Sequence, residues 1–334
     1  MSPFIPKVTV LGCISGKPTA NGGTCGILVE YSPKHYLIYD CPEGTYVKLL
    51  QYNILLSCLH YVVISHMHPD HMAGLLTLIS GLSEICGGSL PSIYGPQALV
   101  KYLEVALPLT DLAERFSRPL KLIPIAPFQT LSSVITADGP WSFIFFPLAH
   151  RIECHGLAMV RDTFSVFDTK KALDSGVPLD KLPELKKTTE GIKFSTVCPR
   201  LKIILCSDND AKRLLADRAY GGVDGATFLQ FIDRTDLRNP DLLLHEFTFT
   251  NYHQEKASLY GHSCTTAVGD LCNELRPKRV LLNHFSVRYK RTACSNRFGV
   301  APPKECVQLT EWHRLFGKVY STAYATEDKV YAIE

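Results

Sequence analysis

The run from Val62 to Leu76, VVISHMHPDHMAGLL, places four metal-binding side chains within six positions. His66, His68, Asp70 and His71 follow an apolar segment that is typical of a buried strand. Imidazole nitrogens and carboxylate oxygens are first-choice ligands for zinc and similar ions. Four ligands in so short a loop exceed what one tetrahedral ion easily accepts. The run therefore predicts two adjacent metal ions at the end of a strand, and packing alone does not account for it.

Other polar residues able to bind metal follow apolar runs elsewhere in the chain. His150 follows SFIFFPLA, Asp208 follows IILCS and His284 follows VLLN. Loops at strand ends commonly carry the chemistry of α/β proteins, because the sheet beneath them is rigid. Asp210 competes with Asp208, which we favour because it lies nearer to the strand end. An exposed surface histidine is the alternative interpretation of His150.

Composition limits the class of protein. The chain has 334 residues, of which 46% are hydrophobic, enough for one large domain or two modest ones. The net charge of +3 neither favours nor excludes a nucleic-acid partner, because a local basic patch can bind phosphate. Twelve cysteines are scattered without a C-x-x-C pair, which favours reduced thiols. We expect a cytoplasmic protein, with the nucleus or an organelle left open for a eukaryotic host.

No segment has the character of a membrane anchor or of a secretory signal. The amino-terminal run MSPFIPKVTVLG lacks a basic start followed by a long apolar stretch. The longest apolar runs, such as SFIFFPLA, are far too short to span a bilayer. We therefore expect no membrane partner.

Apolar runs and three-to-four spacing predict a mixed α/β protein. Strands are expected near Lys7–Leu11, Gly26–Tyr31, Tyr36–Asp40, Tyr61–Ser65, Ser133–Ala137, Ser142–Phe146, Leu157–Arg161, Lys202–Cys206, Asp241–His245 and Arg279–His284. Helices are expected near Thr45–Gln51, Met72–Leu82, Gln97–Leu107, Thr265–Leu275 and Pro303–Phe316. The segment 163–199 is rich in charge and is broken by Pro178 and Pro183, so it is interpreted as an inserted arm.

The run HMHPDH resembles the H-x-H-x-D-H motif of the metallo-β-lactamase superfamily. The order and spacing of the later ligand candidates resemble the ribonuclease Z branch, the tRNA 3′-processing endonucleases. Further likeness lies in VTVLGCISGKPT, YDCPEGTYVKLL, LLLHEFTF, GHSCTTA and NHFSVRY, and it covers nearly the whole chain. The resemblance implies an α/β fold, the four-layer αββα sandwich of that superfamily. It would form a single domain over residues 1–334, with the arm at 163–199 acting as an RNA-gripping exosite.

The same resemblance implies a complete set of ligands for two zinc ions per chain, with manganese or another divalent ion left open. One ion would be held by His66, His68 and His150, the other by Asp70, His71 and His284, and Asp208 would bridge them. Two-metal sites stabilise both the attacking and the leaving oxygens of a phosphoryl displacement. His155 lies five residues beyond His150 and is left out, because the family usually has an aromatic residue there.

Hydrolysis of an RNA phosphodiester expels a ribose oxygen, which is a poor leaving group unless it is protonated. His262 in YGHSCTT is the candidate general acid, and Glu246 in LHEFTF is its partner. Asp70 would orient the attacking water or take its proton. The alternative for His262 is a structural role at the start of the following helix, with Ser263 as the N-cap. LHEFTF lacks the second histidine of H-E-x-x-H, which excludes a zincin protease, and His245 is interpreted as structural.

Basic residues after the last ligand candidate are expected to hold RNA phosphates. The substrate contacts that we predict are Thr45, Arg288, Lys290 and Arg291. Thr45 follows Gly44, and the alternative interpretation is that it only caps a helix. For the basic residues, the alternative is that they lie in a solvated loop without a role in binding. In the motif NHFSVRY, the family's arginine corresponds to Arg288.

The resemblance implies precursor tRNA as the partner and a homodimer as the assembly. Three departures put the reading of the tRNA in doubt. KPTANGG replaces the basic loop near the amino terminus, the arm lacks a Gly-Pro pair, and Pro42 replaces a glycine. The alternatives are a small-molecule phosphodiesterase or hydrolase of the same fold and a non-catalytic RNA-binding scaffold.

Overall fold

The computed structural model describes residues 4–20, 22–84, 90–117, 119–136, 139–216, 226–289, 307–316, 319, 321–324 and 329–333. Lys290 and Arg291, two of the predicted substrate contacts, lie outside these residues. Within the described residues, no helix is both long and apolar enough to span a membrane.

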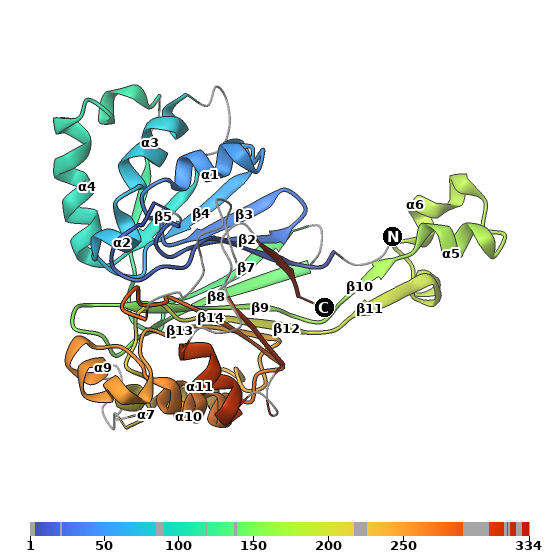
Figure 1. The fold of residues 1–334 in the computed structure, drawn as a ribbon. Helices are drawn as coiled ribbons and strands as arrows, with labels where there is room; N and C mark the ends of the chain where they lie inside the picture. Colours follow the sequence, from blue (N-terminus) through green and yellow to red (C-terminus); the bar gives the residue numbers. More distant parts are fainter. Residues whose placement is uncertain are drawn as a thin grey trace.

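Two seven-stranded sheets form the centre of the protein (Figure 1). The first has the order β16 (Val330–Ala332), β1 (Lys7–Gly12), β2 (Gly26–Ser32), β3 (His35–Tyr39), β4 (Leu59–Val63), β5 (Ser92–Gly95) and β6 (Lys121–Pro124). The second has the order β15 (Ser321–Tyr324), β14 (Arg279–Asn283), β13 (Leu242–Glu246), β12 (Leu201–Leu205), β9 (His155–Arg161), β8 (Gly139–Pro147) and β7 (Thr130–Thr136).

Helices cover the outer face of each sheet (Figure 1). Beside the first sheet lie α1 (Thr45–Gln51), α2 (Pro69–Met72), α3 (Leu75–Ser83) and α4 (Gln97–Leu109). Beside the second lie α7 (Ala211–Ala216), α9 (Gln254–Tyr260), α10 (Thr265–Leu275) and α11 (Val307–Phe316), and α8 (Phe228–Arg234) precedes β13. The predicted four-layer αββα arrangement is confirmed.

Strand β2 shows why its sequence is apolar on both faces. Ile27, Val29 and Tyr31 belong to the core that includes the space between the sheets, whereas Leu28 packs with the core beneath the helices of the first sheet. Alternate side chains of a strand point to opposite faces, so a sheet between two layers needs apolar residues at successive positions. The Tyr31 ring reaches Phe143 of β8 with ring centres 5.5 Å apart, which joins the two sheets.

Segment 163–199 extends away from the sandwich as an arm (Figure 1). It consists of β10 (Phe164–Phe167), α5 (Thr169–Asp174), α6 (Leu182–Leu185) and β11 (Ser195–Cys198). β10 and β11 pair antiparallel and form the stalk, and the two short helices form the tip.

The helix expected near Met72–Leu82 corresponds to α3, and a separate short helix, α2, precedes it. α2 begins at Pro69, inside the histidine-rich run, and α3 begins only at Leu75. A Cβ atom on Gly74 would lie 2.0 Å from the carbonyl oxygen of Pro42, so the chain passes too closely there for any larger residue. This close approach is a tertiary contact and is not visible in the helical periodicity.

Candidate metal centre

The metal centre lies where strands of both sheets end. β4 runs parallel to β3 and β5, and β12, β13 and β14 run parallel to one another. Parallel strands bring their carboxyl ends to the same edge, so loops far apart in sequence meet there. His66 follows β4, Asp208 follows β12 and His284 follows β14.

Four of the predicted ligands form the first cluster. His66, His68, His150 and Asp208 each offer a ligand atom within 4.8 Å of the others. Nε2 of His66 lies 2.9 Å from Nδ1 of His68, and Nε2 of His150 lies 3.2 Å from that same atom. Oδ2 of Asp208 completes the group, 3.6 Å from Nε2 of His66. Three imidazoles and one carboxylate are a zinc-type ligand set.

The second cluster contains Asp70, His71 and His284. Oδ2 of Asp70 lies 3.6 Å from Nε2 of both histidines. Oδ1 of Asp208 lies 3.4 Å from Nε2 of His71 and 3.1 Å from Nε2 of His284. The two oxygens of Asp208 therefore face different clusters, which is the geometry expected of a bridging ligand.

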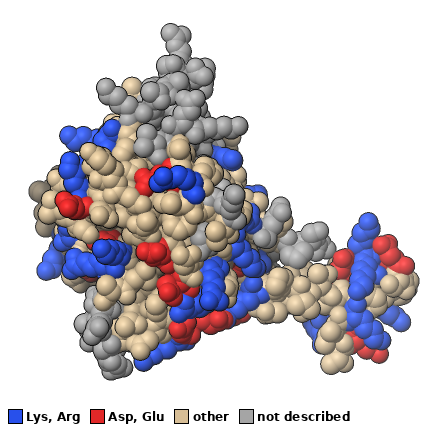
Figure 2. Space-filling model, turned by 60° about the horizontal axis from the view of Figure 1, so that its bottom comes forward, with Lys and Arg blue, Asp and Glu red and all other residues tan. Residues whose placement is uncertain are grey.

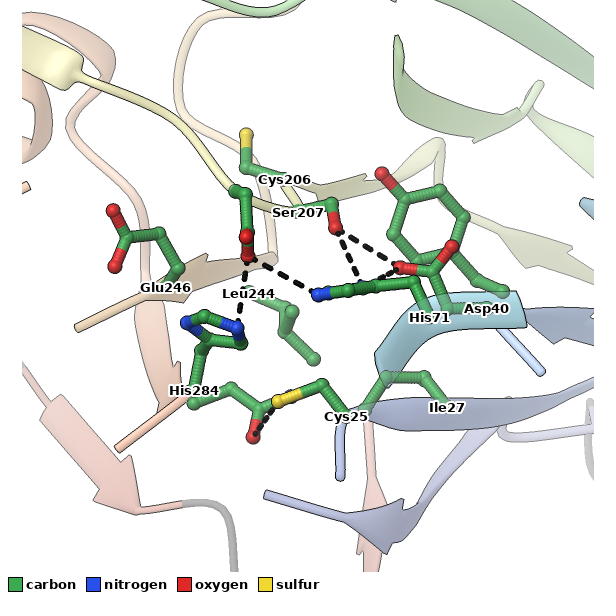
Figure 3. Close-up of a pocket in the computed structure, with 12 residues that line it drawn as sticks. Cys25, Ile27, Asp40, His71, Cys206, Ser207, Leu244, Glu246 and His284 are labelled. Carbon is green, nitrogen blue, oxygen red and sulfur yellow. Dashed lines mark hydrogen bonds and ion pairs between the residues drawn. The ribbon is translucent and has the colours of Figure 1, made fainter. Parts of the chain in front are cut away.

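Unpartnered buried atoms show that this donor set fits metal ions. Nε2 of His71, Nε2 of His284 and Oδ1 of Asp208 are buried, and none makes a hydrogen bond with any residue that the structure describes. A buried polar atom without a hydrogen bond lowers the stability of the folded protein, so each such atom needs an explanation. His71, Asp208 and His284 all line one small cavity, in which Figure 3 labels the two histidines. Bound cations would satisfy all three at once.

Hydrogen bonds at the far ring nitrogens orient these imidazoles. Nδ1 of His71 donates to Asp40 over 2.8 Å, and Nδ1 of His150 donates to the carbonyl of Gly261 over 2.7 Å. Nδ1 of His284 lies 2.8 Å from Oγ1 of Thr248. Each bond turns Nε2 toward the cluster, where the neutral ring can offer that nitrogen to a metal ion.

Asp40 is a positioning residue that the sequence analysis did not identify. It is buried, and its carboxylate accepts hydrogen bonds from the backbone N–H of Ser65 and the hydroxyls of Ser65 and Ser207, as well as from His71. Asp40 and His284 each directly follow a strand and have φ angles of 64° and 58°. Such left-handed residues are uncommon outside glycine and cluster at functional sites.

The two carboxylates that competed as ligands have separate positions. Asp208 belongs to the first cluster and its Oδ1 faces the second, whereas Asp210 accepts hydrogen bonds from the N–H of Arg213 and the hydroxyl of Ser258. Asp210 thus serves the start of α7. His155 lies outside the clusters, with Nε2 3.0 Å from Glu153. His245 bonds to Asn209 and to the carbonyl of Glu246, which is a structural role.

The electrostatic environment favours neutral imidazoles in the first cluster. Burial lowers the pKa of His66 well below its usual value and that of His150 to about 4. Burial also opposes the charged form of His71, but the carboxylates of Asp208 and Asp40 raise its pKa well above the ordinary value. Burial would raise the pKa of Asp208, yet His284 and His71 hold it well below its usual range. Ionised carboxylates this deeply buried need nearby positive charge.

His262 and Glu246 lie beside the clusters. Nδ1 of His262 is 3.6 Å from Oε1 of Glu246 and 3.9 Å from Oδ2 of Asp208. Burial opposes protonation of His262, but Asp208 and Glu246 outweigh it and raise its pKa. Glu246 is buried and also accepts from the N–H groups of Thr248 and Ser263. The geometry suits a proton donor held by a carboxylate, although His262 also groups with Asp208 and His284 as a third ligand set.

The remaining predicted substrate contacts differ in exposure. Thr45 is buried at the start of α1, and its hydroxyl donates to the carbonyl of Pro42 over 2.7 Å, so it is engaged inside the fold. Arg288 is exposed, and its guanidinium lies 4.6 Å from the ring centre of Phe249, which in turn contacts His262.

Arg151 is an exposed basic residue beside the centre that the sequence analysis did not single out. Its guanidinium lies 5.4 Å from the ring centre of Tyr260. Burial is the largest cause that lowers the pKa of His68, and the Arg151 charge lowers it further. Adjacency to the ligand His150 was the only available signal. Arg151 and Arg288 thus place positive charge on the more exposed side of the centre.

Comparisons with known proteins agree with this geometry. A family model described as "Beta-lactamase superfamily domain" matches residues 35–166. A ribonuclease Z of Trichodesmium erythraeum is 30% identical over 293 residues, which cover 85% of each chain. A ribonuclease Z of Acaryochloris marina is 28% identical over 288 residues, which cover 85% of this chain and 87% of the relative. The crystal structure of the short form of human tRNase Z has a TM-score of 0.61 at 19% identity, covers 98% of this chain and 99% of that one, and shows likeness of fold.

Proposed function

The chain belongs to the metallo-β-lactamase superfamily, and from this premise we propose that it is a two-zinc endoribonuclease that removes the 3′ trailer from precursor tRNA. The observation that carries the proposal is the His262–Glu246 pair beside two clusters that share Asp208. A proton donor at this place suits a substrate whose leaving group is an alkoxide, as in RNA. The relatives that match 85% of this chain are ribonucleases Z, which supports the same substrate class.

Each residue has a defined part in the proposed reaction. Asp70 is less buried than His71 and receives a hydrogen bond from the N–H of Gly16 over 2.7 Å, which holds its carboxylate in place to orient the attacking water or take its proton. His262 gives its proton to the departing ribose 3′-oxygen. Glu246 keeps the imidazole of His262 oriented and stabilises its charged form. The products are a 3′-hydroxyl on the tRNA and a 5′-phosphate on the trailer.

Each cluster would hold one ion, and Asp208 would be a ligand of both. Such ions lower the pKa of water and stabilise charge that develops on phosphoryl oxygens. Zinc is the ion that we propose, because the imidazole-rich donor set suits it.

The arm supplies a second surface for a tRNA. Its exposed basic side chains are Lys170, Lys171, Lys181, Lys186, Lys187 and Lys193. Figure 2 shows basic side chains in a stripe on this protrusion, with Asp and Glu side chains beside them. Basic side chains on a protrusion can bind the phosphates of a folded RNA without reading its sequence. The homodimer implied by the resemblance stays a prediction.

The test is cleavage of a 3′-extended precursor tRNA by zinc-loaded protein, with and without a chelator and with both product ends mapped. We expect a 3′-hydroxyl on the tRNA, a 5′-phosphate on the trailer and loss of cleavage with the chelator. Asp70→Ala protein prepared in parallel reports contaminating nuclease. Metal-loaded protein that leaves every precursor intact contradicts the proposal. Hydrolysis of bis(p-nitrophenyl) phosphate without tRNA binding in a gel shift would favour the small-molecule phosphodiesterase.

Arg151 and Arg288 give a prediction about RNA affinity. We expect Arg151→Gln and Arg288→Gln each to raise KM for precursor tRNA about fivefold, with a smaller effect on kcat, because each removes one phosphate contact. The salt dependence of log KM should become shallower by about one unit of slope for each lost contact. The measurement is steady-state cleavage across a series of KCl concentrations. Lys101→Gln on α4 is the matched control, and an equal change in slope for that variant contradicts the assignment.

A further inference from the structure

A second cavity, of about 380 Å³, lies next to the metal centre between α7, α9 and α10. His262 lines this cavity, and its Nδ1 also contacts Glu246 and Asp208. The imidazole is therefore the wall that the cavity and the metal centre share. None of the roles proposed above uses this space.

We propose that this cavity binds the nucleobase of the last retained nucleotide, and that it selects bases with an exocyclic amino group. This inference rests on the proposed function, in which His262 protonates the 3′-oxygen of that nucleotide. The oxygen and the base are attached to the same ribose. Because His262 lines this cavity, a base whose ribose oxygen reaches His262 would lie beside it.

The size and floor of the cavity suit a planar base. Pockets for small organic ligands typically begin at about 300 Å³, which is the scale of a single nucleoside. Ala257, Ala267 and Cys264 supply small, buried apolar surface to the lining. Side chains of this size let the flat face of a base approach closely, without a bulky group in the way.

The charged part of the lining consists mainly of carboxylates, which stand beside the neutral polar side chains of Gln254, Ser258 and Thr266. Glu255 of α9 and Asp270 of α10 are exposed carboxylates that line the cavity. An ionised carboxylate only accepts hydrogen bonds, so it pairs with N–H groups on the edge of a base. Adenine, cytosine and guanine carry an exocyclic amino group, whereas uracil offers only its ring N3–H, which is flanked by two carbonyl acceptors. Two carbonyl oxygens beside ionised carboxylates are unfavourable, so this lining favours a base with an exocyclic amino group.

The same lining disfavours a phosphate or a metal ion as the occupant. Three carboxylates, of Asp210, Glu255 and Asp270, face one lysine, Lys212, so a phosphate would be repelled. Metal binding needs converging ligands, and these carboxylates form none of the groups within the described residues whose ligand atoms converge within 4.8 Å. Asp210 is moreover engaged with Ser258.

The experiment compares two precursor tRNAs that differ in one functional group. The last retained nucleotide is adenosine in one and purine riboside, which lacks only the amino group, in the other. We expect kcat/KM for the adenosine substrate to be about tenfold higher, because a lost hydrogen bond leaves a charged acceptor without its partner. The double variant Glu255→Ala/Asp270→Ala should bring this ratio close to one. Each ratio is measured within one protein preparation, so a partly unfolded variant does not distort it.

Glu104→Ala on α4 is the matched control, because Glu104 is an exposed carboxylate on the helical layer of the other sheet. It should keep the tenfold ratio. Cleavage of both substrates at equal rates by the unsubstituted protein, or a ratio that persists in the double variant, overturns the base pocket and leaves the proposed function standing. Failure to cleave either RNA removes the proposed function, and this inference with it.

Discussion

Asp208→Ala is expected to reduce the metal content from two ions per chain to one or fewer and to lower precursor cleavage by at least about 1,000-fold. Its two carboxylate oxygens face different clusters, so a single substitution removes one ligand from each. It also removes a buried carboxylate whose oxygen lies within 3.4 Å of Nε2 of His71. Two-metal catalysis depends on both ions. Elemental analysis of the purified protein measures the first effect and the precursor assay the second.

Asp210→Ala provides the matched control, because it removes a carboxylate two positions away in the same loop. Asp210 bonds to the first turn of α7 and lies outside the clusters. We expect it to keep two ions and to lose about 1 kcal/mol of stability, the usual effect of removing a helix cap. Two tightly held ions in Asp208→Ala protein would show that Asp208 is not the bridging ligand.

His262→Ala is expected to lower kcat for precursor tRNA by about 100- to 10,000-fold, the usual contribution of a general acid or base. The same variant should lose less than about fivefold on bis(p-nitrophenyl) phosphate, because p-nitrophenolate departs without protonation. Glu246→Gln should show the same selectivity with a smaller loss, since it leaves the imidazole in place but weakens its charged form. Steady-state rates on the two substrates measure the selectivity.

Metal content separates the two interpretations of His262. As a proton donor it can be removed with both ions retained, whereas as a ligand grouped with Asp208 and His284 its loss should release one ion. Elemental analysis of His262→Ala protein that shows two ions supports the proton donor. An equal loss of activity on both substrates, together with a missing ion, contradicts it.

The αββα sandwich could be predicted from the sequence, because its strands are apolar at successive positions. In β2, Ile27 and Leu28 are both buried, against different layers. The short strands β5, β6, β15 and β16 were not predicted, because they are only three or four residues long and carry little periodicity. The gap between α2 and α3 was not predicted either, because the N–H of Gly74 there donates to the carbonyl of Cys41, far earlier in the chain.

The network around Asp40 was also beyond the sequence. Its hydrogen bond with Ser207 joins residues 167 positions apart, across the two sheets. The hydroxyl of Thr248 also contacts His284, 36 positions further along the chain. Neither Asp40 nor Thr248 has a side-chain chemistry that distinguishes it from many others in the chain.

The sequence alone determined which side chains can hold metals, because ligand chemistry is a property of residue type and the run HMHPDH is dense in it. Only the tertiary structure decided which atom of each residue faces the centre. His68 presents Nδ1, whereas His66 and His150 present Nε2. That choice depends on what holds the other side of each ring, as the carbonyl of Gly261 does for His150, 111 positions away. Such contacts exist only after strands from both ends of the chain have packed together.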